Sequence, residues 1–126
     1  MNSKKDIENR QDIENILNAF YRKVFTDQLI GHFFTIIVPL DLEKHIPLIT
    51  DFWESIIFNT QNYRKNVMEI HHDINRQSSI KKEHLDRWVE VFSQTIDEFH
   101  EGKNAILMKQ RARSVATLME IKFSGK

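Results

Sequence analysis

The chain has 126 residues, which suits one domain with a hydrophobic core of its own. Its 18 Lys and Arg residues balance 18 Asp and Glu residues, and this zero net charge argues against nucleic acid or an anionic membrane surface as a partner. Cys is absent, which excludes disulfides, thiolate metal sites and cysteine nucleophiles. Because Gly (3) and Pro (2) are scarce, we expect a mainly helical protein.

The sequence contains no recognisable targeting or membrane segment. Residues 1–10 lack an apolar signal-peptide core, and the longest nearly continuous apolar run, 33–40, is far shorter than the roughly 20 residues of a membrane-spanning helix. We therefore expect a cytoplasmic protein that forms a single domain over residues 1–126. Within it, residues 1–11 would be a polar lead-in and residues 124–126 a tail.

The first predicted element is an amphipathic helix. Asp12 can cap it, and its apolar residues recur every three or four positions from Ile13 to Val24. Phe20 lies on this apolar face and Tyr21 at its edge, so the hydroxyl of an inward Tyr21 must find a partner.

A tight helical turn and a second helix follow. Gly31 within residues 29–34 predicts the turn. Asp41 can cap the second helix, which carries His45 on its apolar face. We extend this helix through Pro47 because the apolar pattern continues in phase beyond the proline.

The second half of the chain contains a loop and two more long helices. Residues 59–66 are polar and predict a loop, and residues 67–72 allow one or two helical turns. A long apolar stripe then predicts a helix over 81–100, with Gly102 as its C-terminal stop. The last helix is expected over about 104–123.

His45 is the most informative of the six His residues, because it occupies a position that the apolar stripe gives to core residues. Taken alone, it is best explained as a core histidine bonded to a carbonyl group. Glu69 and His72 have the Glu-x-x-His spacing of a di-iron site, but no convincing second pair exists. No zinc, calcium, Ser-His-Asp or phosphate-binding pattern is present either. An apolar interior with an inward Tyr21, His45 and Trp88 has the composition of a haem pocket.

Several short motifs, in order and at matching spacing, resemble the truncated haemoglobins, and specifically their third group. The similarity covers residues 13–119. Its motifs are Phe20-Tyr21 with Lys23-Val24, Leu29-Ile30-Gly31 with Phe33-Phe34, His45-Ile46-Pro47 with Asp51-Phe52-Trp53, and Arg87-Trp88 with Phe92, Thr95, Asp97-Glu98, Phe99 and Gly102.

This resemblance implies an all-α, truncated globin fold, in which a two-over-two helical sandwich surrounds haem b. His71 would be the proximal iron ligand, and Tyr21, His45 and Trp88 would form the distal ligand-binding set. Arg64 and Lys65 would be partners for the haem propionates. The haem pocket would be lined by Phe20, Phe33, Phe34, Ile49, Phe52, Trp53, Tyr63, Phe92 and Met119.

The chain departs from the family pattern at two places. It has Gly31-His32 where the family often has Gly-Pro. It also has Lys65 and Val67 where the family often has a Gly and a Pro before the proximal histidine. The loss of that Pro leaves the segment before His71 less constrained, so His72 remains an alternative proximal ligand.

The expected function is reversible binding of oxygen, nitric oxide or carbon monoxide at ferrous iron. Three polar groups around one ligand predict slow oxygen release, which suits oxygen or nitric oxide chemistry better than bulk transport. Nitric oxide dioxygenation, peroxidase-like chemistry and sensing stay open, as does the need for an unidentified reductase. One alternative has His45 as a sixth iron ligand, which suits sensing or electron transfer. The alternative from another class is a cofactor-free helical interaction module.

Overall fold

A computed structural model describes residues 4–33, 42–58 and 80–124 of the protein. In this part of the chain every regular element is helical, which confirms the all-α prediction. The long helices are α1 (Arg10–Phe25), α2 (Leu42–Phe58), α4 (Lys82–Phe99) and α5 (Lys103–Ser124). None of the described helices is long and apolar enough to cross a membrane.

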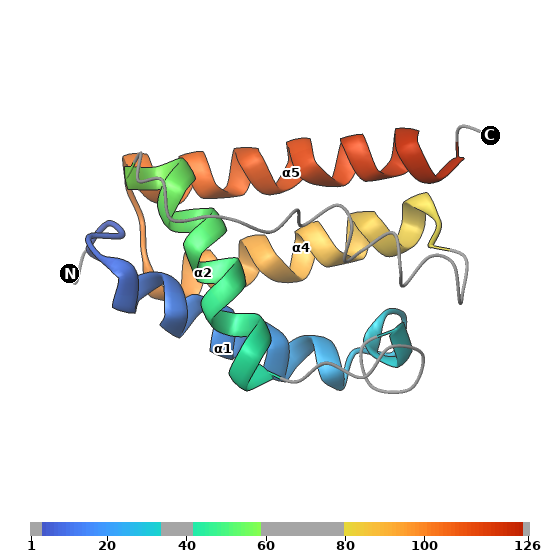
Figure 1. Cartoon of the computed structure of the whole chain (residues 1–126), viewed down its shortest axis with the longest axis horizontal. Helices are drawn as coiled ribbons and strands as arrows, with labels where there is room; N and C mark the ends of the chain where they lie inside the picture. The colour runs from blue at the N-terminus through green and yellow to red at the C-terminus, as the bar shows by residue number, and fades with distance from the viewer. Residues whose placement is uncertain (1–3, 34–41, 59–79, 125–126) are drawn as a thin grey trace.

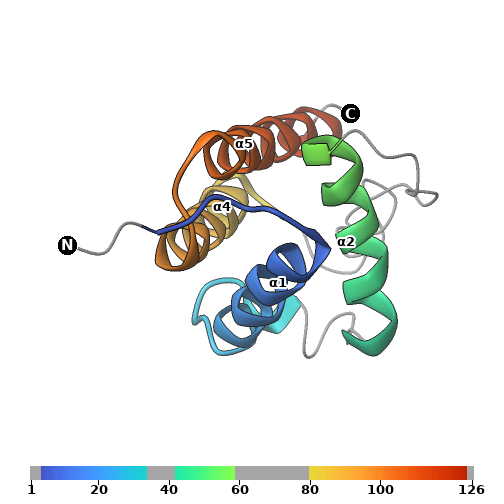
Figure 2. The same cartoon turned by 90° about the vertical axis from the view of Figure 1, so that its left-hand side faces the viewer.

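The helices form two layers (Figures 1 and 2). One layer pairs α1 with α2, which crosses α1 obliquely and also contacts α5. The other layer pairs α4 with α5, which run side by side in opposite directions. Ion pairs from Lys109 to Asp97 (2.6 Å) and from Arg113 to Asp86 (2.9 Å) join α5 to α4. The core between the layers is built mainly from the predicted apolar stripes.

Helix α1 begins earlier than predicted. The cap is Asn9, whose side chain accepts a hydrogen bond from the backbone N–H of Asp12 at 3.0 Å. Asp12 lies in the first turn instead, where its carboxylate accepts the N–H of Glu8 at 2.8 Å. Both residues precede the same apolar stripe, so the stripe alone does not distinguish the two caps.

Residues 4–8 precede α1 without regular secondary structure, and they are bound to the start of α5. Ile7 is buried, and its carbonyl accepts the Asn104 side-chain amide at 2.8 Å. The Asp6 carboxylate accepts the backbone N–H groups of Asn104 at 2.8 Å and Ala105 at 2.9 Å. A side chain from the N-terminal segment thus caps the last helix.

Gly102 lies at the start of α5, whereas the sequence predicts it as the C-terminal stop of α4. Helix α4 already stops at Phe99, and the carbonyl of Gly102 accepts the N–H of Ile106 at 2.9 Å. Its φ of +138° is a conformation that L side chains rarely adopt. A Cβ at this position would also lie 2.7 Å from Cγ of Asp6.

The tight turn after α1 is confirmed within the described residues. The N–H of Gly31 donates to the carbonyl of Asp27 at 2.9 Å. A Cβ at Gly31 would lie 2.9 Å from the carbonyl oxygens of both Val24 and Phe25. Only glycine therefore lets the chain fold back this closely on the end of α1.

The Asp6 cap predicts an acid-sensitive stabilisation. Burial alone would raise the pKa of Asp6, but N–H bonds from Asn104, Ala105 and Ile7 outweigh it and hold the pKa below its ordinary value. This stabilisation is complete above the pKa of unfolded Asp and is lost as the pH falls through the lower, folded value. Asp6→Ala should therefore lower the free energy of unfolding by about 1–2 kcal/mol at pH 7, measured by urea denaturation.

The difference between Asp6→Ala and wild type should shrink as the pH falls below about 4. Glu8→Ala is the matched control, since Glu8 is exposed and only its backbone is bonded. An equal loss in the two variants would contradict the capping role.

Candidate functional site

A buried polar pair joins α1 to α2. The hydroxyl of Tyr21 lies 2.6 Å from Nε2 of His45. Tyr21 is 4% exposed and His45 is 7% exposed, so the pair is almost closed to solvent. The two rings meet edge to face, with centroids 5.1 Å apart. The structure thus brings together two of the three predicted distal residues, and His45 is paired with a hydroxyl rather than being a core histidine bonded only to a carbonyl group.

Aromatic rings from three helices surround this pair. Phe20 packs edge to face on both Tyr21 and Phe92, with centroids 5.0 Å apart in each case. Phe92 of α4 stacks on Trp53 of α2 at 5.3 Å and on Trp88 at 5.6 Å. The half-buried Trp88 therefore belongs to the same aromatic cluster as the predicted distal pair.

The chemistry of the pair depends on the imidazole tautomer. With a proton on Nδ1, His45 accepts the Tyr21 hydroxyl hydrogen at Nε2. With a proton on Nε2, the imidazole donates to the hydroxyl oxygen, and the Tyr21 hydrogen can turn toward another acceptor. Burial raises the pKa of Tyr21, so its hydroxyl stays protonated and remains a donor. The pair can therefore present one O–H donor to an acceptor in an otherwise apolar setting.

The remaining predicted residues fall into three groups. Ile49 and Met119 are buried and Phe52 is half-buried, as pocket walls should be. Phe33 is buried too, and its ring centroid lies 4.2 Å from that of His32 and 4.9 Å from that of His84. The third group lies outside the described residues and consists of Phe34, Tyr63, Arg64, Lys65, His71 and His72.

One face of α2 is suited to a flat apolar group. Leu42, His45, Ile49, Phe52 and Ile56 recur every three or four residues and therefore share a face. His45 is the only polar residue among them, and Leu42, Phe52 and Ile56 are only partly buried. The described residues contain no group of three or more His, Asp or Glu able to hold a bare metal ion. This largely apolar surface with a single imidazole fits a planar macrocycle better than a free cation.

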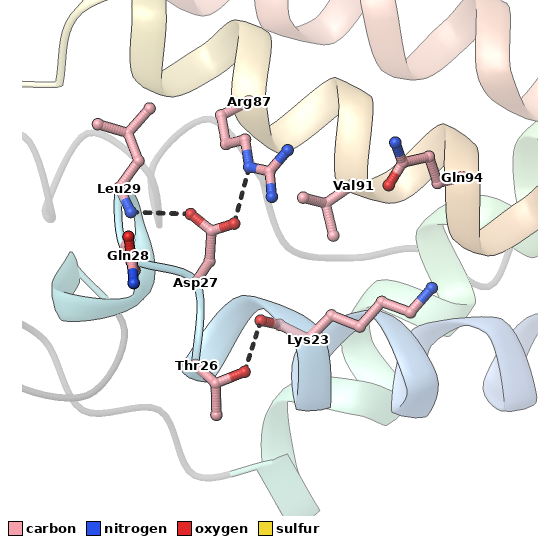
Figure 3. Close-up of a pocket in the computed structure, with 8 residues that line it drawn as sticks. All are labelled: Lys23, Thr26, Asp27, Gln28, Leu29, Arg87, Val91 and Gln94. Carbon is pink, nitrogen blue, oxygen red and sulfur yellow. Dashed lines mark hydrogen bonds and ion pairs between the residues drawn. The ribbon is translucent and has the colours of Figure 1, made fainter.

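Sequence reasoning missed an ion pair that fixes the turn after α1. The Asp27 carboxylate accepts the N–H groups of Leu29 (2.9 Å) and Ile30 (3.1 Å) and the Nε–H of Arg87 (2.7 Å), as Figure 3 shows in part. Burial alone would raise the pKa of Asp27, but Arg87 and the two N–H groups hold it below its ordinary value. Arg87 immediately precedes Trp88, so the turn is anchored beside a predicted distal residue.

An open surface pocket of about 560 Å³ lies next to this ion pair (Figure 3). Lys23, Gln28 and Gln94 line it together with Asp27 and Arg87. The cations are already neutralised, because Lys23 pairs with Glu98 and Arg87 pairs with Asp27 and Glu90. Neither of these two cations is therefore left unpaired to attract an anionic ligand.

No protein-family profile and no curated protein matches the sequence. The structure, however, is similar to the crystal structure of a group III truncated haemoglobin from Campylobacter jejuni, with a TM-score of 0.81. The alignment covers 97% of this chain and 96% of that chain at 21% sequence identity. The chain has a truncated-haemoglobin fold. The predicted resemblance is confirmed at the level of the fold. In this chain Tyr21 lies on α1, His45 on α2 and Trp88 on α4.

The Asp27 contacts predict a large loss of stability when the carboxylate is removed. Its side chain is only 6% exposed and accepts three hydrogen bonds. Asp27→Ala should therefore lower the free energy of unfolding by about 2–3 kcal/mol, because two backbone N–H groups and the Arg87 guanidinium lose a charged acceptor. Asp97→Ala removes an exposed ion pair and should change it by about 0.5 kcal/mol or less. Similar losses of unfolding free energy in the two variants, measured by chemical denaturation, would contradict the role of the Asp27 carboxylate in holding the turn after α1.

Proposed function

We propose that this protein binds haem b and reversibly binds a diatomic ligand, oxygen, nitric oxide or carbon monoxide, at its iron. The observation that carries the proposal is the buried 2.6 Å Tyr21–His45 pair, set in an aromatic wall within a truncated-haemoglobin fold. When bound, haem b would supply the ferrous iron at which such ligands bind. His71 is the proposed proximal ligand, and Arg64 and Lys65 are the proposed partners of the propionates.

The described residues would act on the distal side. Tyr21 would donate its hydroxyl hydrogen to the ligand while His45 donates to the Tyr21 oxygen, and Trp88 would add its indole N–H. Phe20, Phe92 and Trp53 would exclude water from the pocket. Donors in a dry site strengthen binding of a polarised ligand, so slow oxygen release is expected.

Slow release favours oxygen or nitric oxide chemistry over bulk oxygen transport. A turnover that oxidises the iron would require an electron source, and we propose an unidentified reductase for that role. The chain's own contribution would be to hold and orient the ligand through hydrogen bonds from Tyr21 and Trp88.

The Tyr21–His45 hydrogen bond argues against His45 as a sixth ligand of the proposed haem iron, and so leaves that position to a diatomic ligand. Nε2 is the His45 nitrogen that the Tyr21 hydroxyl contacts. For His45 to ligate through that nitrogen, it would have to break a buried hydrogen bond and leave the hydroxyl to find another partner. The six-coordinate alternative is therefore disfavoured in the arrangement described.

An absorption spectrum tests the proposal directly. The purified protein, supplied with haemin, should show a Soret band that shifts when the reduced form is exposed to carbon monoxide. His71→Ala should lose most haem retention, whereas the neighbouring His72→Ala should retain haem. A colourless protein that ignores added haemin would support the cofactor-free interaction module. Equal retention in the two variants would contradict the proximal assignment.

Tyr21→Phe and Trp88→Phe should each speed oxygen release about tenfold, because each removes one hydrogen bond to a polarised acceptor. Stopped-flow displacement of oxygen by carbon monoxide measures this rate. Tyr21→Phe should also increase the six-coordinate fraction of the ferrous spectrum, since His45 loses its hydroxyl partner. Phe99→Leu is the control, because Phe99 is an aromatic residue of α4 that is 42% exposed and lies outside the proposed pocket. Unchanged release rates in both distal variants would overturn the distal assignment.

A further inference from the structure

We propose that Arg10 is a positioning residue, which fixes the rotation of α2 about its own axis and so sets the Tyr21–His45 hydrogen bond. The inference about helix geometry concerns the chain alone. Its consequence for ligand binding rests on the proposed haem function.

The Arg10 side chain forms hydrogen bonds with three successive turns of α2. Its Nη1 donates to Oδ1 of Asp51 at 2.6 Å and to Oε1 of Glu54 at 2.9 Å, and its Nη2 donates to the carbonyl of Pro47 at 3.4 Å. The two ion pairs of Arg10 are not loose surface contacts, because the Asp51 side chain is 29% exposed and the Glu54 side chain 16% exposed. One guanidinium group therefore spans the segment that begins two residues after His45.

The Arg10 contacts lie opposite His45 on α2. At about 100° per residue, Pro47, Asp51 and Glu54 project roughly 180–240° away from His45. Between these two sides lies the face that carries Ile46, Thr50 and Trp53, all of which are buried. Helix α2 is thus held from two opposite sides, with its inner face on the core.

Both contacts come from one face of α1. Arg10 and Tyr21 are about three turns apart on this helix, so their side chains project in nearly the same direction. Helix α2 crosses α1 (Figures 1 and 2). Tyr21 contacts His45 on one side of α2, and Arg10 contacts Pro47, Asp51 and Glu54 on the other. A rotation of α2 in either direction stretches one of these two contacts, and this is why the two together define its orientation.

Pro47 increases the need for such a support. A proline inside a helix has no N–H for the ladder, so the turn that contains His45 is held by fewer backbone bonds. Arg10 contacts the helix immediately after this weak turn, at the Pro47 carbonyl and on the next two turns. A lysine could not replace it fully, because an ammonium group lacks the planar fork that contacts several acceptors at once.

The test compares Arg10→Met with Lys23→Met. Lys23 is the matched control, since it also lies on α1, is 36% exposed like Arg10, and forms a 2.6 Å ion pair, but with Glu98 of α4. The chain has no Cys, so Asn18→Cys and Lys44→Cys can carry spin labels at exposed positions of α1 and α2. We expect Arg10→Met to shift or broaden the label distance by about 2 Å or more, the arc of a modest rotation at the helix surface.

The second measurement uses the haem-loaded protein. Arg10→Met should change the infrared band of bound carbon monoxide and speed oxygen release about fivefold, as partial loss of one hydrogen bond predicts. Arg10→Lys should give an intermediate band and rate, and Lys23→Met should leave both as in wild type. This graded rescue would not arise from a general loss of stability.

The outcomes separate the two proposals. Equal label distances in Arg10→Met and Lys23→Met would overturn the positioning role, whether or not the protein binds haem. A wild-type protein without a Soret band would overturn the proposed function, while the label distances would still decide the role of Arg10. Should Arg10→Met fail to fold, Asp51→Asn and Glu54→Gln each replace one carboxylate that Arg10 contacts with a neutral amide, and they must shift the label distance in the same direction.

Discussion

The hydrogen bond between Tyr21 and His45 is the constraint on which the rest of the described site depends. Both side chains are almost fully buried, and a buried hydroxyl or imidazole without a partner costs free energy. Each group supplies a hydrogen-bond partner to the other, and this bond holds α2 in the rotation that keeps them 2.6 Å apart. The apolar stripes bring α1 and α2 together, but apolar packing is not directional enough to choose this rotation. The Tyr21–His45 bond on one side of α2 and the Arg10 guanidinium on the other are directional contacts, and together they fix the rotation of α2 about its axis.

The aromatic cluster extends the same constraint to α4. Phe20 contacts Tyr21 on one side and both Phe92 and Trp88 on the other, so a shift of Tyr21 would disturb the packing of α4. The Asp27–Arg87 ion pair adds a second link, between the turn after α1 and the residue before Trp88. The three predicted distal residues thus lie on helices that cannot move independently. Such rigidity is what a site needs when its donors must meet a small ligand at a fixed distance.

Local patterns predicted the elements better than the contacts between them. The apolar stripes predicted four long helices, and the inward Tyr21 and His45 followed from their positions on two of these stripes. The roles of Asp6, Gly102 and Arg10 could not be read in the same way, because their partners are remote in the sequence. Asp6 caps a helix that begins at Lys103, and Arg10 meets Asp51. A polar residue in a polar segment carries no local sign of a distant partner, so the sequence pattern assigns Asp6 and Arg10 to a polar lead-in, and Gly102 to the end of the preceding helix.

The departure at Gly31-His32 shows why a motif can lose one residue and keep its geometry. At Gly31 the carbonyl oxygens of Val24 and Phe25 leave no room for a Cβ, so the glycine is imposed by sterics. His32 is exposed, and the turn is held by the Asp27 carbonyl and carboxylate instead. A proline at position 32 would stiffen the turn, but Asp27 already fixes it through hydrogen bonds to Gly31, Leu29 and Ile30. The same function, the orientation of the chain after α1, is thus supplied by Asp27, five residues before position 32, and this exchange is consistent with a shared fold at 21% identity.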